Sequence, residues 1–148
     1  MPEYKYAKGR IADSLQFISR EMEELDRDYQ GASWKDYNED PKLQKLMDRT
    51  VENILTALIE ACGTVCAEEG GKVESYAQVL QSCAALLGFS EQDSGGLSSL
   101  AAQRNRLAHR YLNFRWQAVS AYKKQKGTIL CLLEKVLERE ERKYNPDQ

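Results

Sequence analysis

Apolar residues recur at the spacing of an α-helix through most of this chain, and this pattern limits the available folds more than any other feature. Between residues 11 and 29 the apolar positions are separated by four, three, four, three and four residues. This spacing places them on one face of an amphipathic helix of about five turns. The stripe consists of Ile11, Leu15, Ile18, Met22, Leu25 and Tyr29.

Four more helices are predicted in the same way. Asp40 and Pro41 supply an N-cap and a first-turn proline for a second helix, which the glycine pair at 70–71 ends. Its wide apolar stripe is typical of a central element. The other helices are expected at 73–87, followed by a left-handed cap at Gly88, at 97–111 and at 116–143. Segments 31–40 and 89–96, which contain glycine and many polar residues, are predicted to be loops.

No segment alternates between apolar and polar residues as a half-buried strand does, so the predicted fold class is all-α. Connections of about 2–10 residues favour antiparallel neighbours, and therefore an up-and-down bundle of four main helices with one shorter helix added. A length of 148 residues fits one helical domain, 1–148, whose last few residues are expected to fray.

Composition places the chain among globular proteins, because 42% of its residues are apolar and 30% are charged. No apolar run approaches the ~18 residues of a membrane helix, and the first ten residues lack the apolar stretch of a signal peptide. We therefore expect the protein in the cytoplasm. In that compartment the four cysteines are expected to be buried apolar side chains rather than disulfides.

Charge is distributed unevenly along the chain. Residues 1–103 contain 10 basic and 18 acidic side chains, whereas residues 104–148 contain 11 basic and 5 acidic ones. The last third can present a positive field to a phosphate backbone, or it can carry scattered charges on solvated helix faces.

Several kinds of site are excluded by residues that the sequence lacks. The single histidine, His109, follows Arg106 by three positions, so the Glu-x-x-His pattern of a di-iron bundle is absent. Cys62 and Cys66 stand four apart, which is not the Cys-x-x-Cys spacing of a zinc site. The sequence also has no Gly-rich phosphate loop, no Gly-x-Ser-x-Gly and no His-Glu-x-x-His.

One polar cluster remains, at residues 104–111. At ~100° per residue, Arg104 lies on the same helical stripe as Leu100 and Leu107, where a charge needs a partner. That partner is either a carboxylate, with Glu52 and Asp48 as candidates, or a bound phosphate.

His109 follows Asn105 by four residues, so the amide can orient the imidazole. Arg104 and His109 lie ~140° apart around a continuous helix and ~7.5 Å apart along it, and would not converge on one small group. Either the helix ends near Ala108, or a second copy of the chain completes the site.

This cluster resembles the signature of the HEPN superfamily, and specifically of the HepT-like toxins, which is Arg-x4-His-x-Tyr with Asn after the Arg. Arg104, Asn105, His109 and Tyr111 match every position. The resemblance extends to Leu107, to the long second helix and to the opening amphipathic helix, so it covers most of the chain.

The resemblance implies a metal-independent endoribonuclease that works without a cofactor, as a homodimer whose two motifs face each other across a cleft. Arg104 would hold the scissile phosphate of the RNA and stabilise its developing charge. His109 would move a proton during attack by the ribose 2′-OH, and Asn105 would support it.

The resemblance also implies a partner, a minimal nucleotidyltransferase antitoxin that transfers AMP to Tyr111. This chain lacks the Gly-Ser-x-Asp-x-Asp pattern of such an enzyme and would be the acceptor. A phosphate and a base on Tyr111 would block RNA beside Arg104. The alternative is a noncatalytic binding subunit that uses the same helical surface to partner a nucleotidyltransferase.

Overall fold

The computed structural model describes the backbone of residues 2–109 and 115–144, with side chains at 10–109 and 115–143. These residues form seven helices and no strand, so the predicted all-α fold class is confirmed. The helices are α1 (Pro2–Tyr29), α2 (Trp34–Glu39), α3 (Pro41–Glu68), α4 (Tyr76–Leu86), α5 (Glu91–Ser98), α6 (Leu100–Ala108) and α7 (Arg115–Tyr144). The predicted fraying concerns residues 145–148, which lie outside the described residues.

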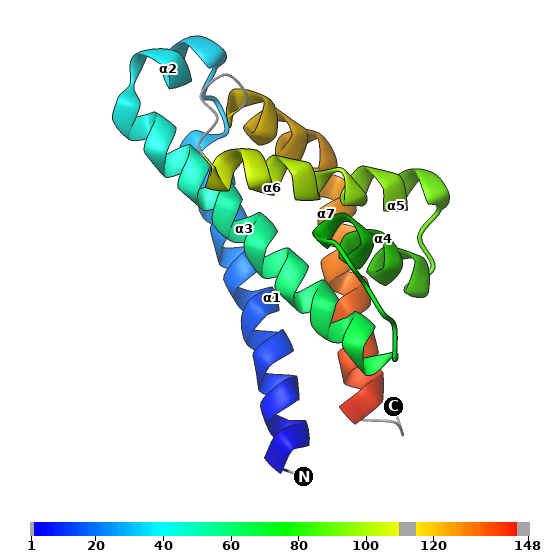
Figure 1. Cartoon of the computed structure of the whole chain (residues 1–148). Coiled ribbons are helices and arrows are strands. Elements are labelled where there is room, and N and C mark those ends of the chain that lie inside the picture. The colour runs from blue at the N-terminus through cyan, green and yellow to red at the C-terminus, as the bar shows by residue number, and fades with distance from the viewer. Residues whose placement is uncertain (1, 110–114, 145–148) are drawn as a thin grey trace.

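The helix α3 is the centre of the bundle. It packs antiparallel beside α1 and also contacts α2, α4, α6 and α7, while α5 and α6 lie across the long helices (Figure 1). Its length and composition would allow a membrane span, but 61% of its apolar window is buried inside the protein. The central role predicted from its wide apolar stripe is therefore confirmed.

Local capping explains where α3 begins and where α4 ends. The Asp40 carboxylate accepts hydrogen bonds from the backbone N–H groups of Lys42 and Leu43 at 3.0 and 3.1 Å, and Pro41 occupies the first turn, as predicted. Gly88 has a φ of +89° directly after the C-cap of α4, in the left-handed region that favours glycine. The helix α4 begins at Tyr76, after its N-cap Ser75, rather than at residue 73.

Two predicted loops are wrong, because each contains a short capped helix. Ser33 and Asp36 form a reciprocal capping box that starts α2 within 31–40. Ser90 caps α5 within 89–96, where it accepts a hydrogen bond from the N–H of Asp93 at 3.1 Å. The predicted helix at 97–111 is divided between α5 and α6, which meet at Ser99. The long last helix, predicted at 116–143, is confirmed as α7.

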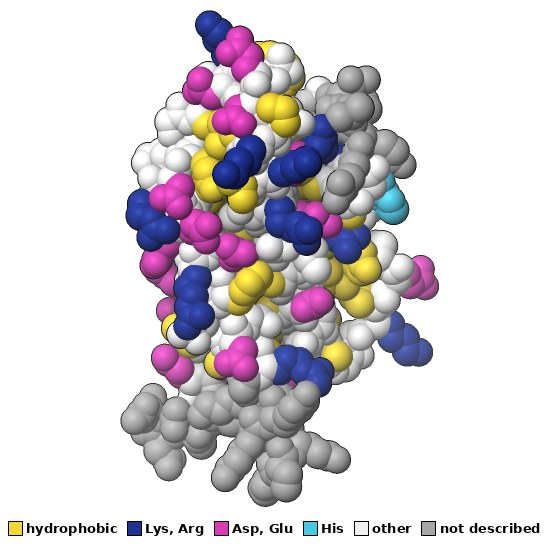
Figure 2. Space-filling view, turned by 90° about the vertical axis from the view of Figure 1, so that its left-hand side faces the viewer, with side chains coloured by type: hydrophobic (Ala, Val, Ile, Leu, Met, Phe, Trp, Pro, Cys, Tyr) yellow, Lys and Arg dark blue, Asp and Glu magenta, His cyan; other side chains and the backbone are white. Residues whose placement is uncertain are grey.

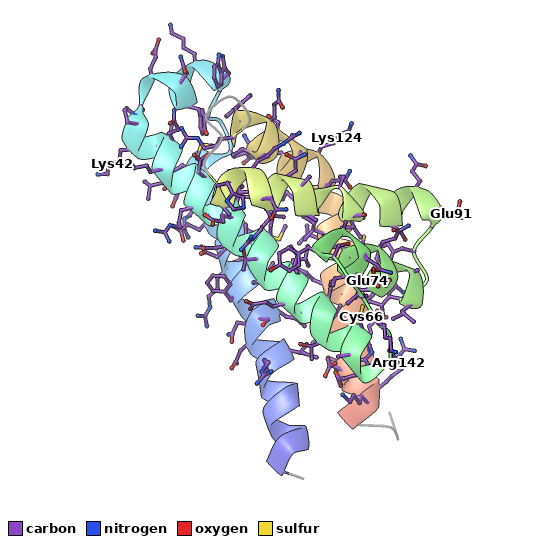
Figure 3. All side chains as sticks on the ribbon, in the orientation of Figure 1. Lys42, Cys66, Glu74, Glu91, Lys124 and Arg142 are labelled. Carbon is purple, nitrogen blue, oxygen red and sulfur yellow. The ribbon has the colours of Figure 1, made fainter. Side chains whose placement is uncertain are left out.

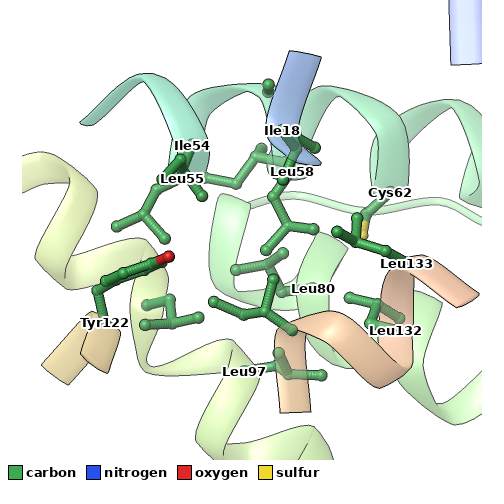
Figure 4. Close-up of a cluster of buried hydrophobic side chains, with 14 of the residues drawn as sticks. Ile18, Ile54, Leu55, Leu58, Cys62, Leu80, Leu97, Tyr122, Leu132 and Leu133 are labelled. Atoms are coloured by element: carbon green, nitrogen blue, oxygen red, sulfur yellow. The ribbon is translucent and has the colours of Figure 1, made fainter. Parts of the chain in front are cut away.

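The core is one cluster of buried apolar side chains to which all seven helices contribute. The short helices α2 and α5 contribute one residue each, Tyr37 and Leu97. Figure 4 shows how Ile18 of α1, Leu58 of α3, Leu80 of α4 and Leu132 of α7 meet in it. Charged side chains such as those of Lys42, Glu91 and Lys124 point away from the bundle (Figure 3).

All four cysteines are free thiols. Cys62, Cys66 and Cys83 are buried as predicted, whereas the prediction for Cys131 is wrong because its side chain is exposed on α7. Hydrogen bonding with Cys83 and burial raise the pKa of Cys62, and burial raises the pKa of Cys66. The thiols of Cys62 and Cys66 are therefore held in the neutral form that suits apolar packing.

Candidate functional site

The helix α6 carries Arg104 and ends immediately before His109. Leu100, Ala101 and Leu107 form its buried face, which packs against α3 and α7. The helix ends at Ala108, and His109 is its C-cap, with its backbone N–H donating to the Asn105 carbonyl at 2.9 Å. Of the two arrangements considered for the motif, the helix end near Ala108 is therefore present. The His109 side chain is exposed there.

The Arg104 guanidinium touches three residues. Its Nε–H donates to the Thr56 hydroxyl on α3 at 3.3 Å, and Nη1 donates to the Asn105 amide oxygen at 3.4 Å. The guanidinium carbon lies 5.5 Å from the centre of the Tyr76 ring, a cation–π distance. None of these partners is anionic, so the positive charge of Arg104 is not neutralised by them.

The expected ion pair of Arg104 with Asp48 or Glu52 is not formed. Asp48 is bound instead by Arg115 and Tyr37, and among the described residues no carboxylate lies within ion-pair distance of Arg104. The first of the two alternatives for this arginine, the ion pair, is therefore wrong, and the bound phosphate stays a prediction.

Arg104 lies at the edge of a surface hollow between α1, α3 and α6, with a volume of about 450 Å³. Its lining includes apolar, basic and acidic side chains, among them Phe17, Arg49, Arg104, Asp13, Glu52 and Glu60. Figure 2 shows one face of the molecule, on which basic side chains lie among apolar and acidic ones, with the histidine at its margin. Positive charge is therefore available locally rather than as a continuous basic surface.

The motif residues are only partly brought together within one chain. Asn105 lies against Arg104, and its exposed side chain uses its amide oxygen to accept from that arginine. Arg104 lies within α6, whereas His109 follows the helix as its C-cap. Tyr111 lies outside the described residues.

Sequence reasoning missed a buried polar network beside the motif. Arg115, the first residue of α7, donates from Nη1 to Asp48 at 3.0 Å and from Nη2 to Gln44 at 3.0 Å. The Tyr37 hydroxyl donates to the other oxygen of Asp48 at 2.6 Å. Burial raises the pKa of Asp48, against the opposing effects of Tyr37 and Arg115. No sequence spacing links these residues, which come from α2, α3 and α7.

Aromatic rings cover this network. Trp116 lies 4.9 Å from Tyr37 and 5.8 Å from Trp34, centre to centre, within the range of favourable aromatic pairs. The start of α7, directly after the segment that contains Tyr111, is thereby fixed against α2 and α3.

The described part of the chain contains no group of three His, Cys, Asp or Glu side chains that could hold a metal ion. The groups around Arg104 include hydrogen-bond donors and aromatic rings beside the carboxylates of the hollow. Such donors can bind a phosphate and orient it.

Comparison with protein families gives a match to a family described as "Ribonuclease HepT-like" over residues 18–130. The matched region runs from α1 to α7 and includes Arg104, Asn105, His109 and Tyr111. A comparison with curated individual proteins finds no match. Ribonuclease membership agrees with the expected endoribonuclease activity and makes RNA the substrate class. Since the match covers well over half of the sequence, the chain belongs to the HepT-like ribonuclease family.

Proposed function

We propose that this chain is the ribonuclease toxin of a cytoplasmic toxin–antitoxin pair and that it cleaves RNA through Arg104 and His109 without a metal ion. The observation that supports this most is the state of Arg104. Its guanidinium is held at a surface hollow by neutral partners and meets no described carboxylate. A positive charge presented in this way is suited to binding a phosphate.

In the proposed reaction the ribose 2′ oxygen forms a bond to phosphorus, and the bond from phosphorus to the 5′ oxygen breaks. One proton leaves the 2′-OH and another is delivered to the 5′ oxygen, giving a cyclic phosphate and a 5′-OH end. His109 moves a proton, because an imidazole exchanges protons near neutral pH. Arg104 stabilises the negative charge that develops on the phosphoryl oxygens.

A homodimer fits these requirements better than a single chain. The chain has one histidine, so one His109 would take the proton from the 2′-OH and return it to the 5′ oxygen. A two-fold axis would place the motifs of two copies in one cleft, where Arg104 of one copy can act with His109 of the other.

The variants Arg104→Ala and His109→Ala test the assignment of the site. Each should abolish cleavage of RNA by the purified protein and should leave the circular dichroism spectrum and melting temperature unchanged, because neither side chain fills the core. Arg142→Ala, which removes an exposed arginine at the far end of α7, is the control and should remain active.

Wild-type activity should survive EDTA. Full activity of His109→Ala, or loss of activity with EDTA, contradicts the proposal, and RNA binding without cleavage in wild type supports the noncatalytic alternative.

Control by AMP transfer to Tyr111 is the second part of the proposal. Tyr111→Phe keeps the ring and removes the acceptor oxygen, so the variant should stay toxic and escape neutralisation by a cognate minimal nucleotidyltransferase. The intact mass of the wild-type protein, expressed with that partner, should increase by AMP. If Tyr111→Phe gains AMP as the wild type does, another residue is the acceptor.

A further inference from the structure

The Arg104 side chain is oriented by residues that lie far from it in sequence. Thr56 comes from the middle of α3 and Tyr76 is the first residue of α4, whereas Arg104 belongs to α6. Neither Thr56 nor Tyr76 is part of the motif at 104–111. Both contacts therefore exist only because the bundle brings three helices together.

The two hydrogen bonds engage two of the three guanidinium nitrogens, Nε and Nη1. Nε–H is engaged by Thr56, and one N–H of Nη1 is engaged by Asn105. Of the five N–H donors of an arginine, both on Nη2 and the second one on Nη1 then remain. Nη2, which forms no hydrogen bond among the described residues, contributes donors to both edges of the guanidinium that can bind a phosphate.

Tyr76 contributes the third contact, against the flat face of the guanidinium. Tyr76 is 48% exposed, so solvent reaches part of its side chain. It is the first residue of α4, whose start is capped by the Ser75 side chain, which accepts a hydrogen bond from the N–H of Gln78 at 3.1 Å. The guanidinium carbon lies over the ring, 5.5 Å from its centre, and the ring attracts the positive charge without neutralising it.

We propose that Thr56 and Tyr76 are positioning residues, which hold the Arg104 guanidinium at the hollow between α1, α3 and α6 with its Nη2 donors available to a ligand. The proposal rests on the proposed role of Arg104 in binding the scissile phosphate. A long arginine side chain samples many rotamers, so fixing it before RNA binds reduces the ordering needed at the reacting phosphate.

Side-chain NMR measures this positioning without RNA and without cleavage. The Nε–H signal of Arg104 is assigned by its absence from the ¹⁵N spectrum of Arg104→Lys. In the wild type its order parameter should be about 0.6 or higher, above the range of flexible groups. Thr56→Val, which removes the acceptor at nearly constant shape, and Tyr76→Leu, which removes the ring, should both lower it. Thr56→Ser and Tyr76→Phe are the matched controls and should preserve it.

Single-turnover RNA cleavage gives the functional measurement. Thr56→Val and Tyr76→Leu should each lower the rate on the order of 10-fold or more, because small displacements of a catalytic group have large effects on rate. Thr56→Ser and Tyr76→Phe should retain most activity. In an Arg104→Lys background neither Thr56→Val nor Tyr76→Leu should lower RNA affinity or cleavage further, since the fork that they orient is gone.

The outcomes separate this inference from the proposed function. A flexible Arg104 signal in the wild type, or one that Thr56→Val and Tyr76→Leu leave unchanged, overturns the positioning role whether or not the protein cleaves RNA. Equal loss in Thr56→Val and Thr56→Ser, with lowered helicity, also overturns it, because the loss is then structural. If Arg104→Ala cleaves RNA normally while the NMR result holds, the proposed function fails and the orientation of Arg104 by Thr56 and Tyr76 stands.

Discussion

Arg104 and Arg115 are both partly buried arginines near the motif, but their partners give them different roles. Arg115 is paired with the Asp48 carboxylate at 3.0 Å, so its charge is neutralised inside the protein. Arg104 has a hydroxyl, an amide oxygen and an aromatic ring as partners, and its charge stays available. At the scale of single residues, the partner rather than the residue type separates a structural arginine from a candidate ligand-binding one.

The Arg115–Asp48 pair should be important for stability. The two side chains are only 13% and 11% exposed, so Arg115→Met leaves a carboxylate in the interior without its main partner. We expect a loss of about 3 kcal/mol in the free energy of unfolding, measured by urea denaturation. Arg142→Met, which breaks an exposed pair with Glu138, should change it by no more than about 0.5 kcal/mol. Equal effects of the two variants would show that the buried pair is not a stabilising contact.

Removing the polar group of Tyr122 should not lower the free energy of unfolding, in contrast to the loss expected for Arg115. The Tyr122 side chain is 1% exposed, burial raises its pKa, and its hydroxyl finds no hydrogen-bond partner among the described residues. Tyr122→Phe removes an unsatisfied polar group and keeps the ring, so the free energy of unfolding should stay constant or rise by up to about 1 kcal/mol. Thermal and urea unfolding measure the change. A clear loss of stability would mean that the hydroxyl has a partner in solution.

At the scale of elements, capping residues explain why α2 and α5 are helices although their composition is typical of loops. The segments that became α2 and α5 look like loops because glycine and polar residues outweigh their few apolar positions. Each begins at a serine that accepts a hydrogen bond from the backbone three residues later. Each also buries residues, including Tyr37 in α2 and Leu97 in α5, so packing stabilises helices that are too short to form alone.

The adjacent glycines of α5 should respond differently to alanine. A Cβ on Gly95 meets nothing within 4 Å, so Gly95→Ala should raise the free energy of unfolding by about 0.5–1 kcal/mol. A Cβ on Gly96 would lie 2.8 Å from the Gln125 amide oxygen, so Gln125 must move and most of the gain should be lost. Urea denaturation of both variants is the test. If Gly96→Ala is stabilised as much as Gly95→Ala, Gln125 does not restrict this site.

At the scale of the whole molecule, the two residues proposed to act on RNA lie in different local settings. Arg104 lines the hollow between α1, α3 and α6, whereas His109 follows the end of α6 with its side chain exposed. A two-fold dimer offers a direct way to combine Arg104 of one copy with His109 of the other.

This arrangement predicts a dimer in solution and complementation between inactive variants. Light scattering at micromolar concentration should give about twice the chain mass of 16.9 kDa. Mixed and refolded Arg104→Ala and His109→Ala proteins should regain about a quarter of the wild-type rate, because about half of the dimers are mixed and each contains one intact composite site. An active monomer contradicts the dimer, and a dimer without complementation shows that each site uses residues of one chain.

The sequence predicts the main helices, some of their ends and the family motif. Helical periodicity predicted α1, α3, α4 and α7, since an amphipathic stripe reflects burial along one continuous segment. Asp40, Pro41 and Gly88 placed helix ends because a cap acts over only a few residues. The motif at 104–111 identified the family for the same reason, as it is contained in one short stretch of chain.

Tertiary structure alone decided which groups surround that motif. Asp48 was a plausible partner for Arg104 by sequence, but packing of α7 against α3 gives Asp48 to Arg115. Packing of α4 and α6 on α3 then brings Tyr76 and Thr56 to Arg104. Periodicity shows which face of a helix is buried. It does not show which helix packs on that face, or at which position along the axis. The partners of a buried charge therefore depend on the assembled bundle, while the existence of its helices is already determined by the sequence.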